Sequence, residues 1–138
     1  MTFQDKIIAE FDSKRRIVHL TAESEIRFNE PEDLLILYKD ACEILERYTG
    51  DGPVYLLVDL ARFIVDPSLF GFYAEKSAKL KEKFLYPEGM AGYGFQITRV
   101  TVQLSYGDCD KRPPLFKTRR EAEEYLENLA SIRQSISS

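Results

Sequence analysis

Four side chains suited to ligand binding follow one another closely in the middle of the chain. Asp59, Arg62, Asp66 and Ser68 come after the apolar run Val54–Val58. Such a run, with turn-forming residues before it and a carboxylate after it, is typical of a strand buried on both faces. Because ligands of α/β proteins collect where strands end and helices begin, we expect a binding site at this segment.

The dipeptide Asp66-Pro67 predicts that a helix begins there, since Asp favours the N-cap and Pro the first helical position. The free amides and positive dipole of a helix N-terminus attract anions, and Arg62 or Arg99 would add positive charge. The simpler interpretation, which we favour, is that Asp66 and Ser68 only cap the helix, which contributes about 1 kcal/mol.

His19 and a stripe of lysines are the other groups with chemical potential. His19 has no acid–base partner near it in the sequence, and we predict a histidine on the surface or edge of a strand. Lys76, Lys79 and Lys83 recur at helical spacing, which would suit an acidic partner or a lipid headgroup surface. We favour a solvated helix face for the lysines, because exposed charges contribute little to stability.

The composition is that of a soluble globular domain. The chain has 138 residues, a net charge of −4 and a pI of about 5.1, which argues against nucleic-acid binding by bulk charge. No apolar run is long enough to span a membrane, and acids interrupt the N-terminal segment where a secretory signal would be apolar. Two cysteines without a C-x-x-C pair, together with one histidine, predict no zinc site and no other cofactor, and they favour the reducing cytoplasm.

The first half of the chain alternates between strand and helix patterns. A hairpin of residues 6–11 and 16–21 precedes an amphipathic helix over 30–48. We expect the N-cap of this helix at Asn29, with Glu32 completing a near capping box. The central strand at 54–58 then follows.

The second half continues the alternation, which predicts one α/β domain over residues 1–133 and a frayed tail at 134–138. Residues 98–106 fit either a strand or a helix. The whole pattern predicts a mixed sheet of four or five strands with helices mainly on one face. The remaining expected elements are a helix from 67, its end at 86–89, a strand at 90–97, a short strand at 115–117 and a helix capped by Thr118.

Two segments resemble STAS domains, the sulfate-transporter and anti-sigma-factor-antagonist family. Residues 58–69, VDLARFIVDPSL, are similar to the loop of these domains in which an Asp-Ser pair opens a helix. Residues 115–126, LFKTRREAEEYL, look like the closing strand and helix of the SpoIIAA-like branch of the family. The family's phosphorylated serine directly follows the aspartate, where this chain has Pro67, and Ser68 comes one residue later. The resemblance therefore implies a STAS-like fold without the family's phosphoserine switch.

The function expected from these observations is binding without catalysis. The sequence contains no recognisable Ser-His-Asp set, paired carboxylates or metal cluster. The resemblance implies a regulatory or protein-interaction module with a regulatory protein as its partner. The alternative is a protein that binds a small ligand, which would be an anion, a nucleotide or a lipid. Homodimer formation stays open. The candidate binding residues are Asp59, Arg62, Asp66, Ser68 and Arg99.

Overall fold

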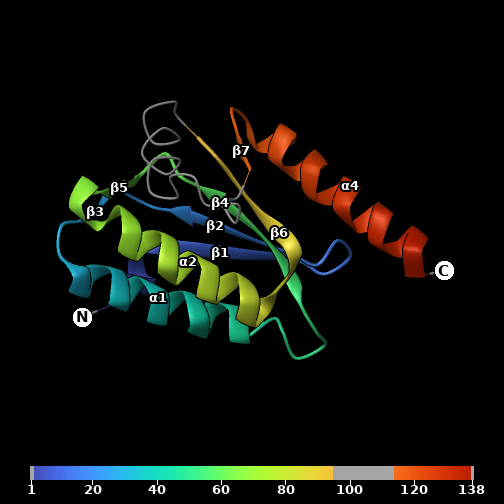
Figure 1. Ribbon diagram of the computed structural model, residues 1–138, viewed down its shortest axis with the longest axis horizontal. Coiled ribbons are helices and arrows are strands. Elements are labelled where there is room, and N and C mark those ends of the chain that lie inside the picture. The colour runs from blue at the N-terminus through green and yellow to red at the C-terminus, as the bar shows by residue number, and fades with distance from the viewer. Residues whose placement is uncertain (1, 95–113, 138) are drawn as a thin grey trace.

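A five-stranded mixed sheet in the order β1-β2-β4-β6-β7 lies at the centre of the fold (Figure 1). The computed structural model describes residues 2–94 and 114–137. Strands β1 and β2 form an antiparallel hairpin, and β2, β4, β6 and β7 run parallel to one another. The α/β class and the mixed sheet are therefore confirmed. The strands are β1 (Ile7–Asp12), β2 (Ile17–Ala22), β4 (Val54–Asp59), β6 (Leu85–Tyr93) and β7 (Leu115–Phe116).

Three α-helices cover this sheet within the described ranges. Helices α1 (Pro31–Glu46) and α2 (Phe70–Phe84) pack side by side on one face, and α4 (Arg119–Ser137) lies on the other (Figure 1). The described helices thus lie two on one face and one on the other. Helix α4 extends to Ser137, so the segment expected as a frayed tail from residue 134 is helical as far as that residue.

Strand β4 is buried on both faces, as its apolar run predicts. It lies between β2 and β6, and its successive side chains point to opposite faces of the sheet, as in any β-strand. Val54, Leu56 and Val58 pack into the core beneath α1 and α2. Tyr55 and Leu57 pack into a separate core beneath α4. The strand therefore contributes to both hydrophobic layers.

The start of α1 differs from the prediction by one residue. The N-cap is Glu30 instead of Asn29, and Asp33 instead of Glu32 completes the capping box. The Asp33 carboxylate accepts hydrogen bonds from the backbone N–H groups of both Asn29 and Glu30 at 3.0 Å. Pro31 explains the shift, because proline is best placed at the first helical position and so makes the residue before it the cap.

The segment between β4 and α2 also differs from the prediction of a helix that begins at Pro67. A short strand β5 (Phe63–Val65) pairs in parallel with β3 (Ile26–Phe28) to form a second, two-stranded sheet. Asp66 then precedes a 3-10 helix, Pro67–Leu69, and α2 itself begins only at Phe70. The sequence carries no signal for β3 and β5, because three residues are too few to show a periodic pattern.

The predicted helix end at 86–89 is wrong. Helix α2 ends at Phe84, and β6 begins directly at Leu85 and continues through these residues. The pairing of β6 with β4 changes register here, and Glu88 has a positive φ of 59°, which is typical of a bulged strand. A bulge also accommodates a proline, which explains Pro87 within a strand. The segment 98–106, left open between strand and helix, lies outside the described residues.

Candidate functional site

The carboxyl ends of β4 and β6 border an open hollow that contains two of the predicted site residues. Asp59, Arg62, Tyr93 and Lys117 line it. Asp59 ends β4 and accepts a hydrogen bond on Oδ1 from the backbone N–H of Ala61 at 3.0 Å, which turns the chain away from the sheet. The location agrees with the general placement of ligands in α/β sheets.

Arg62 is held mainly by backbone carbonyl groups. Its Nη1 donates to the carbonyl oxygens of Ala22 at 3.1 Å and Glu23 at 2.6 Å. Its own carbonyl accepts from the N–H of Ile26 at 2.8 Å. Arg62 therefore ties the end of β2 to the start of β5, and this positional role uses part of its hydrogen-bonding capacity.

Asp66 and Ser68 form a separate pair after β5. The Asp66 carboxylate accepts from the backbone N–H of Ser68 at 2.9 Å and from its hydroxyl at 2.7 Å. These two bonds hold the pKa of Asp66 below its usual value. The three residues of β5 span roughly 10 Å of chain between Arg62 and this pair. The structure thus divides the predicted site into two groups, and Arg99 lies outside the described residues.

His19 is buried, although the sequence suggested a surface or edge position. It is 6% exposed, because β2 lies between β1 and β4 and is not an edge strand. Its Nε2 lies 2.6 Å from the hydroxyl of Tyr93, and the two rings stack at 5.8 Å. Burial lowers the pKa of His19 and raises the pKa of Tyr93 to about 12. Sequence reasoning could not find this pair, because β6 brings Tyr93 to His19 from a distant part of the chain.

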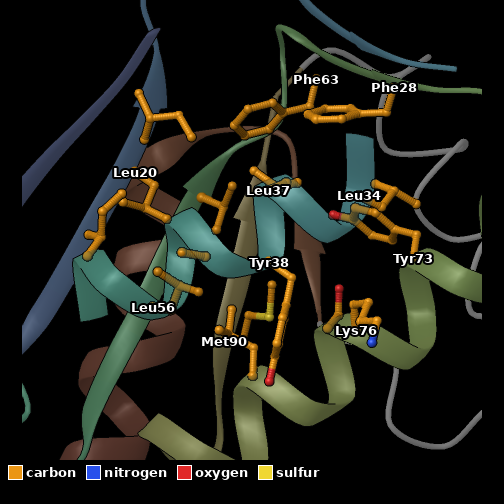
Figure 2. A pocket seen from close by; sticks show the side chains of 16 residues that line it. Leu20, Phe28, Leu34, Leu37, Tyr38, Leu56, Phe63, Tyr73, Lys76 and Met90 are labelled. Atoms are coloured by element: carbon orange, nitrogen blue, oxygen red, sulfur yellow. The ribbon is translucent and has the colours of Figure 1, made fainter. Parts of the chain in front are cut away.

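An apolar cavity of about 80 Å³ lies between the sheet and helices α1 and α2 (Figure 2). Both helices and four strands of the large sheet, β1, β2, β4 and β6, contribute to its wall, and Phe28 and Phe63 close it on the side of the small sheet. The apolar side chains that line it are Ile7, Leu20, Phe28, Leu34, Leu37, Ala41, Ile44, Leu56, Val58, Phe63, Leu80 and Met90.

Four polar side chains reach this cavity, and three of them come from α2. Tyr73, Lys76 and Ser77 line it from α2 and Tyr38 lines it from α1. Tyr73 and Ser77 are hydrogen-bonded to each other, and burial raises the pKa of Tyr73 to about 12. The cavity therefore combines an apolar interior with a small group of hydroxyls and one ammonium.

Lys76 differs from Lys79 and Lys83 because it lines the cavity, although Lys83 also lies over a ring, 5.2 Å from the centre of Phe84. The Nζ of Lys76 lies 5.3 Å from the ring centres of both Tyr38 and Phe72. Lys79 instead forms an exposed ion pair with Glu75 at 3.4 Å, as expected for a solvated face. The solvated-face interpretation is therefore wrong for Lys76. Its spacing from Phe72 and Tyr73 on one helix was the signal available in the sequence.

Comparisons with known proteins leave the family open. No protein-family model matches the chain, and no curated protein matches it. Within residues 2–94 and 114–137, no helix is both long and apolar enough to cross a bilayer. The same residues contain no cluster of three or more histidine, cysteine or acidic side chains arranged to hold a metal ion.

Proposed function

We propose that the protein is a non-catalytic binding module that holds a small amphiphilic ligand in the cavity between the sheet, α1 and α2. The ligand would place a short apolar group among the core side chains and an anionic head near Lys76. The observation that carries the proposal is the cavity itself, which is apolar inside and has an ammonium among its lining groups.

The energetics of the cavity support this proposal. Protein interiors pack to the density of organic crystals, so an apolar void is costly to keep. At about 24 cal/mol per Å³, a cavity of 80 Å³ costs about 2 kcal/mol. A ligand that fills it would recover a comparable amount, which is enough to contribute to weak or moderate affinity.

The size of the cavity limits the class of ligand. An apolar cavity of about 150 Å³ holds a benzene molecule, and 80 Å³ is about half of that. A short alkyl group therefore fits, whereas a long acyl chain would require α1 and α2 to separate. The charge of Lys76 favours a carboxylate or phosphate head over a neutral one. The proposed ligand class is a short-chain organic anion.

The experiment is a titration with pentanoate, followed by ¹³C-methyl NMR of the cavity leucines and Met90. Saturable shifts confined to those methyl groups, with weaker binding of pentanol, would support the proposal. Ala41→Leu should fill the cavity and abolish the shifts, and Lys76→Gln should remove the preference for the anion. Lys79→Gln removes the same charge from an exposed position on the same helix and should bind like the parent protein. Failure of both pentanoate and pentanol to shift these signals would refute the proposal.

A regulatory protein partner is the second candidate function, and a STAS-like identity belongs with it. Its support is the order of elements, because a hairpin followed by alternating helices and parallel strands agrees with the resemblance. The segment 61–68 would be the contact surface, since Arg62 and Ser68 are exposed there. A pull-down from cells of the native host, repeated with Arg62→Ala and Ser68→Ala, tests this. Loss of one specific partner in both variants would support it. A cytoplasmic location is part of the same proposal.

A further inference from the structure

A cleft of about 340 Å³ lies at the end of the sheet opposite the carboxyl-end hollow, between the β1–β2 turn and α4. Lys14, Arg15, Arg16 and Arg133 line it, and Glu127 is the one acidic residue among the lining groups described. The chain as a whole has a net charge of −4, so this local excess of positive charge runs against the average. Such a local excess attracts anions.

Not every cation in the cleft is equally available. Arg15 is neutralised, because it pairs with Asp12 at 2.6 Å, Glu127 at 2.7 Å and Glu123 at 3.4 Å. The acidic neighbour Glu127 is thereby occupied as well. The ammonium of Lys14, on the exposed turn, has no ion pair within the described ranges. The attraction for an anion therefore rests mainly on Lys14 and Arg16, neither of which pairs with a carboxylate among the described residues.

Arg16 is held in place by neutral backbone groups and not by carboxylates. Its Nε donates to the carbonyl of Pro53 at 3.1 Å, and its Nη2 donates to the carbonyls of Tyr48 at 3.2 Å and Gly52 at 2.9 Å. All three acceptors are neutral carbonyl groups, so none of these bonds compensates the positive charge of the guanidinium. Its Nη1 has no hydrogen-bond partner in the part of the chain that the structure describes. A fixed guanidinium with donors to spare loses little entropy on binding an oxyanion.

Tyr55 adds a buried donor to the same cleft. The residue is 2% exposed, and its hydroxyl accepts a hydrogen bond from Nε of Arg133 at 3.2 Å. The Arg133 guanidinium also lies 4.0 Å from the ring centre of Tyr86, which fixes its position. The hydroxyl hydrogen of Tyr55 has no acceptor among the described residues. This hydrogen can therefore be donated to an acceptor that enters the cleft.

We propose that this cleft binds the phosphate group of a small phosphate ester. The Tyr55 hydroxyl, the Arg16 guanidinium and the Lys14 ammonium together offer donors to several phosphate oxygens, and Arg133 lines the same cleft and holds the Tyr55 hydroxyl in place. Charge-assisted bonds of this kind are the strongest available to a phosphate. The cleft volume leaves room for an organic group next to the phosphate, beside Leu126 and Ala130 of α4. The site is separate from the cavity beneath α1 and α2 and does not depend on its ligand.

The test is a ¹H–¹⁵N NMR titration with inorganic phosphate and glycerol phosphate at low ionic strength. Saturable shifts at residues 14–17 and 127–134 are expected, with glycerol phosphate binding more tightly. Lys14→Gln and Arg133→Gln should each weaken binding about five- to tenfold, corresponding to about 1–1.4 kcal/mol. Tyr55→Phe should weaken it while the protein stays folded. Lys79→Gln removes the same charge on the opposite side of the sheet and should have no effect.

A second experiment, with phosphatidylcholine vesicles that contain phosphatidate, distinguishes a free phosphate ester from a lipid headgroup. Binding of glycerol phosphate with no co-sedimentation of vesicles supports a free ester, and vesicle binding lost in Lys14→Gln supports a lipid headgroup. Equal weakening by Lys79→Gln would show general charge attraction and overturn the proposal. Shifts outside the cleft, or no saturable shift with either phosphate compound, would also overturn it.

Discussion

Nε2 of His19 and the hydroxyl of Tyr93 lie 2.6 Å apart, although β4 runs between the strands that carry them. His19 is in register with Leu57 on β4, and Tyr93 is in register with Asp59. The tyrosine therefore reaches diagonally across the central strand. The bond joins side chains of β2 and β6, which share no backbone hydrogen bonds, on the face of the sheet that α4 covers in part.

We expect Tyr93→Phe to destabilise the protein by about 1–3 kcal/mol, because it leaves the buried Nε2 of His19 without its partner. Urea unfolding of Tyr93→Phe, His19→Leu and the double variant measures the coupling. The double variant should lose clearly less free energy of unfolding than the two single variants lose in sum. Strict additivity would show that the bond contributes nothing to stability.

The titration of His19 should reduce stability in mild acid. Burial lowers the pKa of His19 in the folded protein below its usual value of 6.5, so the unfolded chain binds the proton more readily. The contribution of neutral His19 to the stability of the folded state is present above pH 6.5 and is lost as the pH falls through the lower folded pKa. Because the chain has one histidine, its ring protons in ¹H NMR report this pKa directly. A pKa at or above 6.5 would contradict the expectation.

Ionisation of Tyr93 should reduce stability at high pH. Its pKa is raised to about 12 by burial, with the nearby carboxylate of Asp59 adding to the effect. The folded state then favours the neutral phenol, so this contribution is present below the unfolded pKa of about 10 and is lost as the pH rises toward 12. Ultraviolet titration of the parent protein and Tyr93→Phe should differ by one late-titrating phenol.

Leu57→Ala should destabilise the protein by about 2–5 kcal/mol, because the leucine is 1% exposed and its removal leaves a cavity beneath α4. Urea melts provide the measurement. Leu35→Ala is a suitable control, since Leu35 is 47% exposed on α1 and should change stability much less. A loss below about 1 kcal/mol for Leu57→Ala would show that this position repacks or is not central.

Ser68 should not be a regulatory phosphosite. Its hydroxyl already donates to the Asp66 carboxylate at 2.7 Å, so a phosphate there would meet a negative charge at contact distance. Phosphopeptide mass spectrometry of protein from the native host, sampled across growth conditions, is the measurement. Substantial phosphate on Ser68, together with altered partner binding by Ser68→Asp, would restore a phosphorylation switch.

The elements found from the sequence are those whose signals are local. The apolar run Val54–Val58 marks a two-sided buried strand wherever it lies, because its own residues carry the pattern. Thr118 caps α4 by accepting from the N–H of Glu121 at 3.2 Å, three residues away. Asp59 and Arg62 lie at one hollow, and their signal is also local, because both closely follow the strand that carries them to the carboxyl edge.

The tertiary structure decided the features that depend on distant residues. His19 and Tyr93 are 74 positions apart, and Tyr55 and Arg133 are 78 apart, so no periodic pattern links either pair. The apolar cavity depends on how α1 and α2 pack against the sheet, and its lining residues look like ordinary core positions in the sequence. Hydrophobic spacing specifies which face of an element is buried, but only the packed arrangement specifies which buried side chains meet and where space remains between them.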